Sequence, residues 1–131
     1  TEEIFTLISK SKKSIHLEKF IELPKSFQNK ELNEKWLELK KIRDICNISI
    51  EAKRAAKEIG SSLEANLTIS LNEKLFKITE NTNFSELCIT SDVKIKRGEL
   101  EETSVVTVRA EGEKCPVCWR IIKNGCKRHL A

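Results

Sequence analysis

The chain has 131 residues, a formal net charge of +4, and 34% charged but only 5% aromatic residues. This length and composition suit one ordinary domain with a small appendage and a modest core, and no apolar run is long enough to cross a bilayer. The chain begins at Thr1 and contains no methionine, so we expect a processed chain or a piece of a larger protein.

The first half of the chain is predicted to be helical. Residues 1–23 have the pattern of a helix end followed by an irregular connection, which Pro24 interrupts. One long helix is predicted over residues 33–59, with Asn33 as its N-cap and Gly60 ending it. Its apolar positions cover more than half of the helix circumference, which is wider than a helix packed on one side needs. We therefore expect this helix to pack on two sides, with part of its partner surface in an N-terminal portion outside these residues.

Beyond the long helix the pattern changes to that of a small sheet. Residues 67–71 alternate between apolar and polar side chains, which predicts a half-buried strand, and residues 72–79 predict a short helix capped by Asn72. Further strand candidates are residues 87–90, residues 105–110 and an edge hairpin through 93–95 within the polar stretch 91–103. The expected fold class is α+β: a long helix, then a small mostly antiparallel sheet, then a C-terminal zinc knuckle.

The last 17 residues contain four candidate metal ligands in the order Cys-x2-Cys-x7-Cys-x2-His: Cys115, Cys118, Cys126 and His129. A two-residue gap lets one tight turn bring both side chains of a pair onto the same ion, and zinc prefers four tetrahedral thiolate and imidazole ligands. Gly125 supplies a backbone position that can take positive φ directly before the third ligand. Because all four positions are filled, the pattern predicts a closed, structural zinc site and not a catalytic one.

Two other interpretations of the cysteines are open at this point. A redox-active Cys-x-x-Cys pair usually opens a helix in a βαβ unit, and it gives the second Cys/His pair no role. A disulfide framework would leave one of five cysteines over, and no signal peptide or apolar export segment precedes them. Reduced, metal-binding cysteines predict a cytoplasmic protein. Cys46 and Cys88 stand alone among apolar residues, so we interpret both as small buried hydrophobes, and His16 as a surface or packing residue.

The excess positive charge lies at the zinc end of the chain. From Lys114 onward there are five basic residues and no acidic one, with Trp119 among them. A basic surface with an exposed aromatic side chain suits an RNA backbone and an unstacked base. The predicted RNA-contacting residues are Lys114, Trp119, Arg120, Lys123, Lys127 and Arg128. The alternative is that the cations offset the charge of three thiolates on one ion, with Trp119 packed beneath it.

Three stretches share a recognisable pattern. Residues 56–65 read Ala-Lys-Glu-Ile-Gly-Ser-Ser-Leu-Glu-Ala, residues 36–43 read Trp-Leu-x-Leu-x-x-Ile-Arg, and residues 110–119 read Ala-Glu-Gly-Glu-Lys-Cys-Pro-Val-Cys-Trp. Together and in this order they resemble the C-terminal part of bacterial isoleucyl-tRNA synthetases: the last helix of the anticodon-binding bundle, its junction with the next domain, and the entrance to the zinc finger. The resemblance spans nearly the whole chain, although the intervening sheet matches only in pattern.

The resemblance implies a division into three parts: residues 1–60 as the end of the helical anticodon-binding domain, 61–110 as a small α+β junction domain, and 111–131 as the zinc finger. It implies a parent enzyme that attaches isoleucine to its tRNA, with ATP and Mg²⁺ in a catalytic domain outside these residues. No ATP-cradling motif, nucleophile or acid/base pair occurs here, so no catalytic residue is predicted. The expected ligands and partners are one structural Zn²⁺, isoleucine tRNA and the remainder of the synthetase chain, with no membrane, in a monomer.

One departure from the family concerns the finger. The better-known form has a much longer loop between its cysteine pairs and ends in a cysteine, whereas this chain has seven residues there and His129. Histidine is an ordinary zinc ligand, so metal binding is still expected. RNA contacts carried by the longer loop are not.

Two other function classes fit parts of the sequence. One is a zinc-stabilised protein-interaction or general nucleic-acid-binding module of a larger cytoplasmic protein. The other is the DNA-binding zinc end of a repair glycosylase, against which the sequence of residues 59–65 argues. Binding to tRNA that falls steeply with added salt would separate a synthetase arm from an interaction module.

Overall fold

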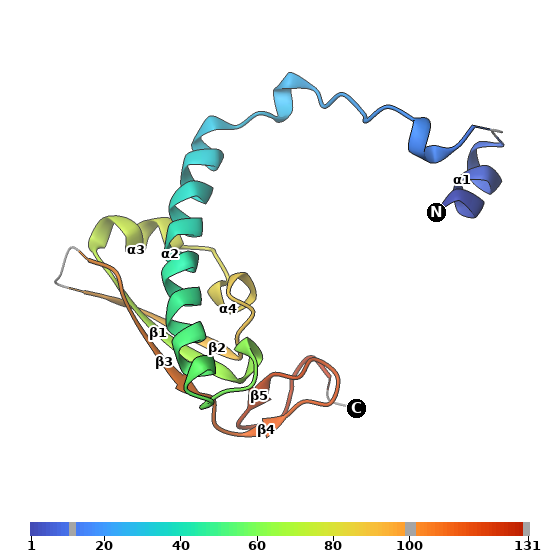
Figure 1. Ribbon diagram of the computed structural model, residues 1–131. Coiled ribbons are helices and arrows are strands. Elements are labelled where there is room, and N and C mark those ends of the chain that lie inside the picture. Colours follow the sequence, from blue (N-terminus) through green and yellow to red (C-terminus); the bar gives the residue numbers. More distant parts are fainter. Residues whose placement is uncertain (11–12, 99–101, 130–131) are drawn as a thin grey trace. The chain divides into compact units, whose positions relative to one another are not determined.

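A computed structural model describes residues 1–10, 13–98 and 102–129 of the chain. They belong to two compact units, Thr1–Lys30 and Glu31–Ala131. The larger unit contains nearly all of the long helix, a small mixed sheet and the C-terminal cysteine cluster (Figure 1). The predicted α+β class is therefore confirmed, whereas the three-part division at residues 60 and 110 stays a prediction.

The smaller unit is held by local hydrogen bonds. Helix α1 (Glu2–Ser9) is followed by irregular chain with two 3-10 turns. These turns are Ile15–Leu17 and Lys25–Phe27. The Glu2 carboxylate accepts hydrogen bonds from the Ser14 hydroxyl and the Ile15 N–H, and these bonds lower the pKa of Glu2. None of the described residues of this unit is buried, and His16 is exposed, in line with the surface role predicted for it.

Helix α2 (Lys30–Ala55) is the long helix that the sequence predicts. One of its faces is buried, because side chains recurring every three or four residues are at most 2% exposed: Leu39, Ile42, Cys46 and Ile50. Other apolar positions face solvent, and Ile48 is 71% exposed. The described residues thus cover one side of α2, and packing on a second side stays a prediction. No helix in the described part of the chain has both the length and the apolar character needed to cross a membrane.

Both ends of α2 differ from the prediction. The helix begins at Lys30, so Asn33 lies within its first turns and is not the N-cap. The Lys-Glu-Leu sequence before Asn33 has good helix propensity, which explains the earlier start. At the other end Lys57 takes the left-handed conformation (φ 58°), and the N–H groups of Lys57 and of the next residue bond back to carbonyls of the last turn. This is a Schellman motif in which Lys57 occupies the place predicted for Gly60.

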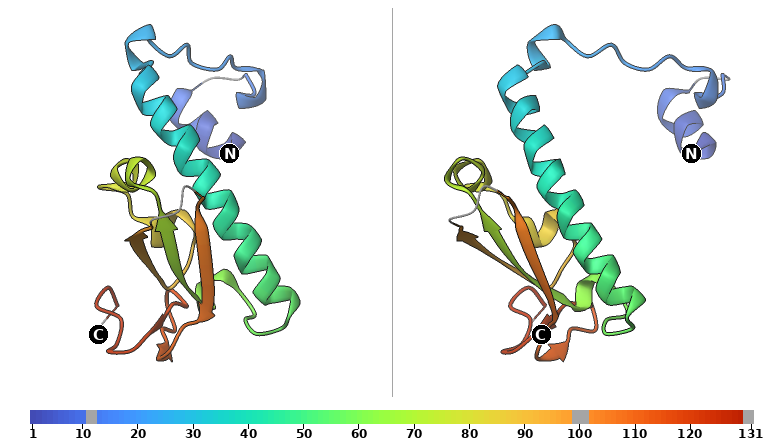
Figure 2. Two further views of the ribbon diagram at one scale, coloured as in Figure 1. Left: turned by 90° about the vertical axis from the view of Figure 1, so that its left-hand side faces the viewer. Right: turned by 60° about the vertical axis from the view of Figure 1, so that its left-hand side comes forward.

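The main sheet has three strands in the order β2-β1-β3. They are β1 (Ala65–Leu71), β2 (Asp92–Arg97) and β3 (Ser104–Arg109). The central strand pairs with β3 in antiparallel and with β2 in parallel orientation. Alternate side chains along β1 are buried in a core shared with α2, which lies against one face of the sheet (Figure 2). The half-buried strand predicted over residues 67–71 is thereby confirmed.

Two short helices, α3 (Glu73–Thr79) and α4 (Phe84–Leu87), complete the core. Asn72 caps α3 as predicted, because its side-chain oxygen accepts a hydrogen bond from the N–H of Leu75 at 2.9 Å. On α4, the Phe84 side chain is only 3% exposed. Both helices therefore add apolar side chains to the core beneath the sheet.

One predicted strand is wrong, and another segment is a strand without the predicted hairpin. Leu87 is the last residue of α4, residues 88–90 follow it as a turn and not as a strand, and Ile89 in that turn takes a positive φ of 55°. This conformation is strained for a β-branched residue, and a local propensity argument does not predict it. Residues 93–95 lie in strand β2, but they form no edge hairpin with β3, because β2 and β3 lie on opposite sides of β1. Residues 99–101 of that polar stretch lie outside the described residues.

The two isolated cysteines are buried, as predicted. Cys46 on α2 is fully buried and Cys88 at the end of α4 is 3% exposed. A hydrogen bond from the Cys46 thiol to Cys88 raises the pKa of Cys46 and lowers that of Cys88. Nearby, Arg43 Nε donates to the carbonyl of Leu87 at 2.9 Å. These contacts join α2 to α4 across more than 40 residues of sequence.

Replacing Ile42 by alanine should remove about 2–5 kcal/mol from the free energy of unfolding, because the lost transfer energy and the cavity left behind add together. The Ile42 side chain is 1% exposed at the contact between α2 and the sheet. Ile48→Ala is the matched control on the exposed side and should change stability by no more than about 0.5 kcal/mol. Urea unfolding followed by circular dichroism measures both variants. Equal losses in the two would contradict the assignment of the packed face.

Candidate metal centre

The four predicted ligands lie in and after a small hairpin that follows the main sheet. Strands β4 (Glu113–Lys114) and β5 (Ile121–Ile122) pair in antiparallel orientation. Gly112, just before β4, has a φ of 128°, and a Cβ at this position would lie 2.5 Å from the carbonyl group of Ile122. Only glycine permits this close approach of the two chain segments. The hairpin is thereby closed at its base, and the loops beyond it carry the ligands.

The first ligand pair sits in the tight turn between β4 and β5. The N–H of Trp119 donates to the carbonyl of Cys115 at 2.9 Å, and the N–H of Cys115 donates to the carbonyl of Arg120 at 2.9 Å. Trp119 has a φ of 64°, a conformation uncommon for residues other than glycine, asparagine and aspartate. Gly125 has a φ of 76°, so it takes the positive φ predicted for it, directly before the third ligand, Cys126.

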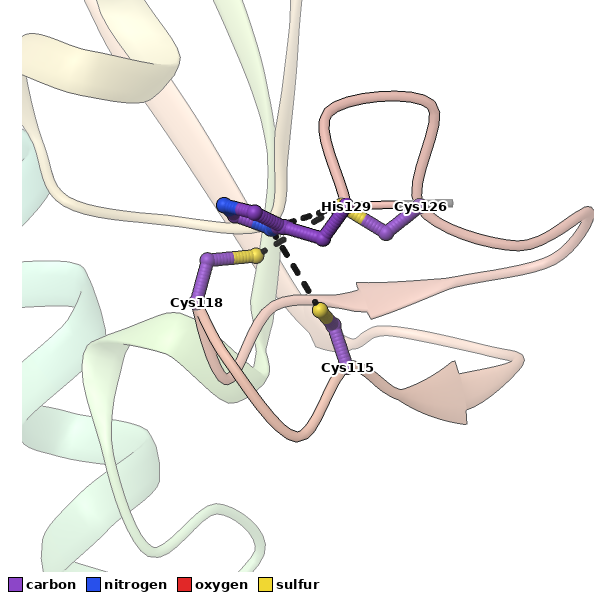
Figure 3. A group of neighbouring side chains, drawn as sticks. All are labelled: Cys115, Cys118, Cys126 and His129. Carbon is purple, nitrogen blue, oxygen red and sulfur yellow. Dashed lines mark hydrogen bonds between the residues drawn. The ribbon is translucent and has the colours of Figure 1, made fainter. Parts of the chain in front are cut away.

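All four side chains converge on one point (Figure 3). Their ligand atoms lie within 4.8 Å of one another. The sulfurs of Cys118 and Cys126 are 3.7 Å apart, and Nδ1 of His129 lies 3.6 Å from the sulfur of Cys115 and 3.3 Å from that of Cys126. With Zn–S bonds of about 2.3 Å and Zn–N bonds of about 2.0–2.1 Å, tetrahedral coordination separates two sulfurs by about 3.8 Å and a sulfur and a nitrogen by about 3.6 Å. The cluster therefore has the dimensions of a closed four-ligand metal site.

Backbone N–H groups favour the ionised form of one ligand. Hydrogen bonds from the N–H groups of Cys118 and Val117 lower the pKa of the Cys115 thiol to about 6. The N–H of Arg120 acts in the same direction on Cys118, but desolvation and the thiols of Cys115 and Cys126 outweigh it and raise the pKa of Cys118. Accumulating negative charge at one point is costly without a cation, which agrees with a cluster built to hold one.

Neither of the other interpretations of these cysteines describes this geometry. The turn containing Cys115 and Cys118 joins two strands and does not open a helix, unlike a redox-active pair. All five cysteines are free, and the histidine completes the set of four converging side chains. A metal site accounts for all four side chains together.

The hairpin is attached to the rest of the larger unit through Ser91. The Ser91 hydroxyl donates to the carbonyl of Leu63 at 2.5 Å and accepts a hydrogen bond from the N–H of Ile121 in β5 at 2.7 Å. An ion pair between Lys114 and Glu64, at 3.6 Å, crosses the same junction. Nothing in the sequence indicates this role for Ser91, because its two partners are 28 and 30 residues away.

The predicted RNA-contacting side chains fall into two groups. Three cations are in ion pairs with glutamates: Lys114 with Glu64, Lys123 with Glu111, and Arg128 with Glu86. Arg120 and Lys127 have no ion pair within the described residues, and Trp119 is 60% exposed. The count of charges from Lys114 onward missed these glutamates because all three precede that residue in sequence. The surface of the knuckle, which is the segment from β4 to His129, is therefore less positive than the sequence of this segment indicates.

Comparison with known proteins identifies relatives of the chain. No family model matches it. The isoleucine–tRNA ligase of Pelagibacter ubique is 64% identical over 98% of this chain, that of Bartonella henselae 36% over 82%, and that of Agrobacterium fabrum 34% over 92%. This chain is homologous to isoleucine–tRNA ligases. The resemblance seen in its sequence is thus confirmed, and the chain spans 12–14% of the length of these three ligases.

Substituting Ser91 with alanine should loosen the hairpin of this ligase homologue. The change leaves the N–H of Ile121 and the carbonyl of Leu63 without their partner, which costs about 1–3 kcal/mol for buried groups. Hydrogen exchange at the Ile121 N–H should accelerate, while exchange at the amides of β1 stays slow. Ser85→Ala, which removes a hydroxyl bonded only to the exposed Asn83 side chain, is the matched control. Unchanged exchange at Ile121 would contradict the anchoring role.

Removing one ligand should abolish metal binding without unfolding the sheet. We expect one metal ion per chain in native mass spectrometry and none in Cys126→Ala, because three remaining ligands bind far more weakly than four. A structural zinc contributes on the order of 10 kcal/mol in isolated fingers, so the hairpin should lose its order in this variant. Cys46→Ala removes a thiol outside the cluster and should keep the ion. Retention of a tightly bound ion by Cys126→Ala would mean that the ligand set is different.

Proposed function

We propose that this chain is the tRNA-binding, C-terminal part of an isoleucine–tRNA ligase and that it holds the anticodon arm of isoleucine tRNA. The parent enzyme would attach isoleucine to that tRNA, with ATP and Mg²⁺ in a catalytic domain outside these residues. The observation that carries the proposal is the 64% identity over 98% of the chain to such a ligase. No residue of this chain is proposed to be catalytic.

In this proposal the metal is one Zn²⁺ with a structural role. Its ligands would be Cys115, Cys118, Cys126 and His129. Three sulfurs with one imidazole nitrogen form a donor set that binds zinc in preference to hard cations such as Mg²⁺. With four protein ligands no position is left for a reacting water. The ion would hold the two loops of the knuckle together, so that the side chains around it keep a fixed arrangement.

The knuckle would contact RNA through one aromatic side chain and several cations. Trp119 is 60% exposed in a strained backbone conformation, and strain of this kind clusters at functional sites. Its indole is available to stack on an unstacked base, which is how proteins commonly bind single-stranded RNA loops. Arg120 and Lys127 would meet phosphates directly. Lys123 and Arg128 could exchange their exposed glutamate partners for phosphates at small cost, because exposed ion pairs contribute little. Lys114 would reach a phosphate beside its half-buried partner Glu64.

The rest of the chain would connect this surface to the parent enzyme. We assign residues 1–60 to the end of the helical anticodon-binding domain, 61–110 to the junction domain and 111–131 to the zinc finger. The exposed apolar positions of α2, such as Ile48, would face the remainder of the synthetase chain. A monomeric enzyme acting in the cytoplasm agrees with reduced cysteines and with the function of charging tRNA.

A protein-interaction module is the second candidate function. The observation that favours it is the partial neutralisation of the knuckle, where three of the five cations are paired with glutamates. Val117, 64% exposed beside the metal cluster, is a further apolar contact point. Such a module would not bind tRNA, whereas the ligase arm would bind it with a strong dependence on salt.

Replacing Arg120 and Lys127 together by alanine should weaken binding of transcribed isoleucine tRNA by about tenfold. The slope of log affinity against log salt should fall by about 1.5, because two phosphate contacts are lost. The matched control is Lys40→Ala with Lys74→Ala, which removes the same charge from exposed positions on α2 and α3. Filter binding or fluorescence anisotropy at several salt concentrations measures both. Equal affinities of the two double variants would place the contact surface elsewhere, and no binding by the unmodified chain would favour the interaction module.

A further inference from the structure

The second face of the main sheet carries polar and basic side chains. Within the unit Glu31–Ala131, helix α2 lies against one face of the sheet (Figure 2), and the core is on that side. The alternate side chains of the three strands therefore point to the other face. Strand register places Asn66 between Asp92 and Val108, and Thr68 between Lys94 and Val106. Val106 and Val108 are 59% and 52% exposed. This face therefore combines exposed apolar surface on β3 with polar and charged groups on β1 and β2.

A hollow of about 560 Å³ lies where this face meets the hairpin of the metal centre. The residues that line it come from the sheet and from the hairpin. The sheet contributes Asn66, Asp92, Lys94 and Val108, and the hairpin contributes Ile122 of β5 and the next residue, Lys123. The Ser91 hydroxyl, which joins the two, also lines it. This volume is within the range of roughly 300–1,000 Å³ that is usual for small-molecule sites.

The chemistry of the lining fits a nucleobase better than a fully apolar or a fully ionic ligand. Val108 and Ile122 supply apolar surface for the face of a ring, and the Asp92 carboxylate can accept hydrogen bonds from base N–H groups. The Asn66 side-chain oxygen is buried and has no hydrogen-bond partner among the described residues. The terminal torsion of asparagine is soft, so this amide can turn toward the edge of a bound base and gain a partner.

Cations at the rim complete the requirements for a nucleotide. Lys94 has no ion pair within the described residues, and Lys123 is paired only with the exposed carboxylate of Glu111. A phosphate on either side of the base can therefore meet an ammonium group without displacing a buried partner. No aromatic residue is among the described residues that line the hollow, so recognition would rest on apolar contact and edge hydrogen bonds.

We propose that this hollow between the sheet and the knuckle binds one unstacked nucleobase of single-stranded RNA, with Lys94 on an adjacent phosphate. The inference rests on the proposed function, and it names a second contact surface beside the knuckle. Asp92 and Asn66 form hydrogen bonds with the edge of a base bound here. Trp119 and the unpaired cations of the knuckle hold a neighbouring part of the same RNA strand. Ser91 positions the two surfaces relative to each other, because it bonds to segments on both sides of the hollow.

Two variants with matched controls test the proposal on the full chain. Lys94→Ala should weaken binding of a stem–loop RNA with the anticodon-arm sequence of an isoleucine tRNA by about fivefold, and Lys94→Arg should restore most of it. Lys40→Ala, on the helix that covers the opposite face, should leave affinity unchanged. Val108→Glu places a negative charge in the hollow and should weaken binding by more than tenfold. Ile48→Glu adds the same charge to an exposed site on α2 and should not.

A base analogue in the RNA gives the second readout. With 2-aminopurine placed at each loop position in turn, one position should change its fluorescence on binding to the unmodified chain, and the change should be lost in Val108→Glu. If Lys94→Ala and Val108→Glu bind like their controls while Arg120→Ala with Lys127→Ala binds weakly, the hollow is not a base site and the proposed function stands. If the unmodified chain binds no RNA, the proposed function and this inference both fail.

Discussion

The rest of this structure depends on the burial of alternate side chains along β1. Ala65, Leu67, Ile69 and Leu71 are at most 2% exposed and pack in one core with α2. Because the period of a strand is two, burying this set forces Asn66, Thr68 and Ser70 to the other face. The same strand pairs with both β2 and β3, so its register decides which residues of those strands face the core. The polar surface that we propose to contact RNA is thus a consequence of how the core is made.

The metal centre stands on this framework and is not an independent module. The N–H of Ser91 bonds to the carbonyl of Ala65 at the start of β1, and its hydroxyl reaches both Leu63 and β5. Glu64, between Leu63 and Ala65, adds the ion pair with Lys114, and its own pKa is lowered chiefly by the Gly60 N–H. A metal ion held by the four candidate ligands would fix the loops within the knuckle, whereas these bonds fix the knuckle to the sheet. Two different kinds of interaction would therefore determine where Trp119 lies.

The net charge of the knuckle surface, on which RNA binding would depend, is set by the assembled fold. Counted along the sequence, the knuckle is a basic segment, and in the structure three of its cations meet glutamates from elsewhere in the chain. The pairs of Lys123 and Arg128 are exposed, so they contribute little to stability and are weakened by salt. They lower the attraction for arbitrary anions while leaving the cations available to a phosphate that is held in place by other contacts. In the proposed role, this would favour an RNA whose shape brings several contacts together over any polyanion.

Much of the structure follows from local patterns in the sequence. The spacing of Cys115, Cys118, Cys126 and His129 identified four side chains that converge on one point, because ligand pairs in tight turns are local arrangements. The alternation along β1, the Asn72 cap and the burial of Cys46 were predictable for the same reason, since each depends on neighbours within one or two turns of chain. Homology to isoleucine–tRNA ligases was also readable from three short stretches.

Only the tertiary structure decided the remaining features. The strained conformation of Ile89 ends α4 where β propensity indicated a strand, and parallel pairing with β1 replaced a hairpin that β2 was expected to form. The Ser91 anchor, the pairs of Lys114 with Glu64 and Arg128 with Glu86, and the hollow beside the knuckle join residues separated by roughly 20–60 positions in sequence. No local pattern encodes such contacts, because each arises only after the core has brought distant segments together. By itself the sequence determined the four converging candidate ligands and the buried face of β1, because both are local patterns. The surfaces that a partner would meet were decided by the fold.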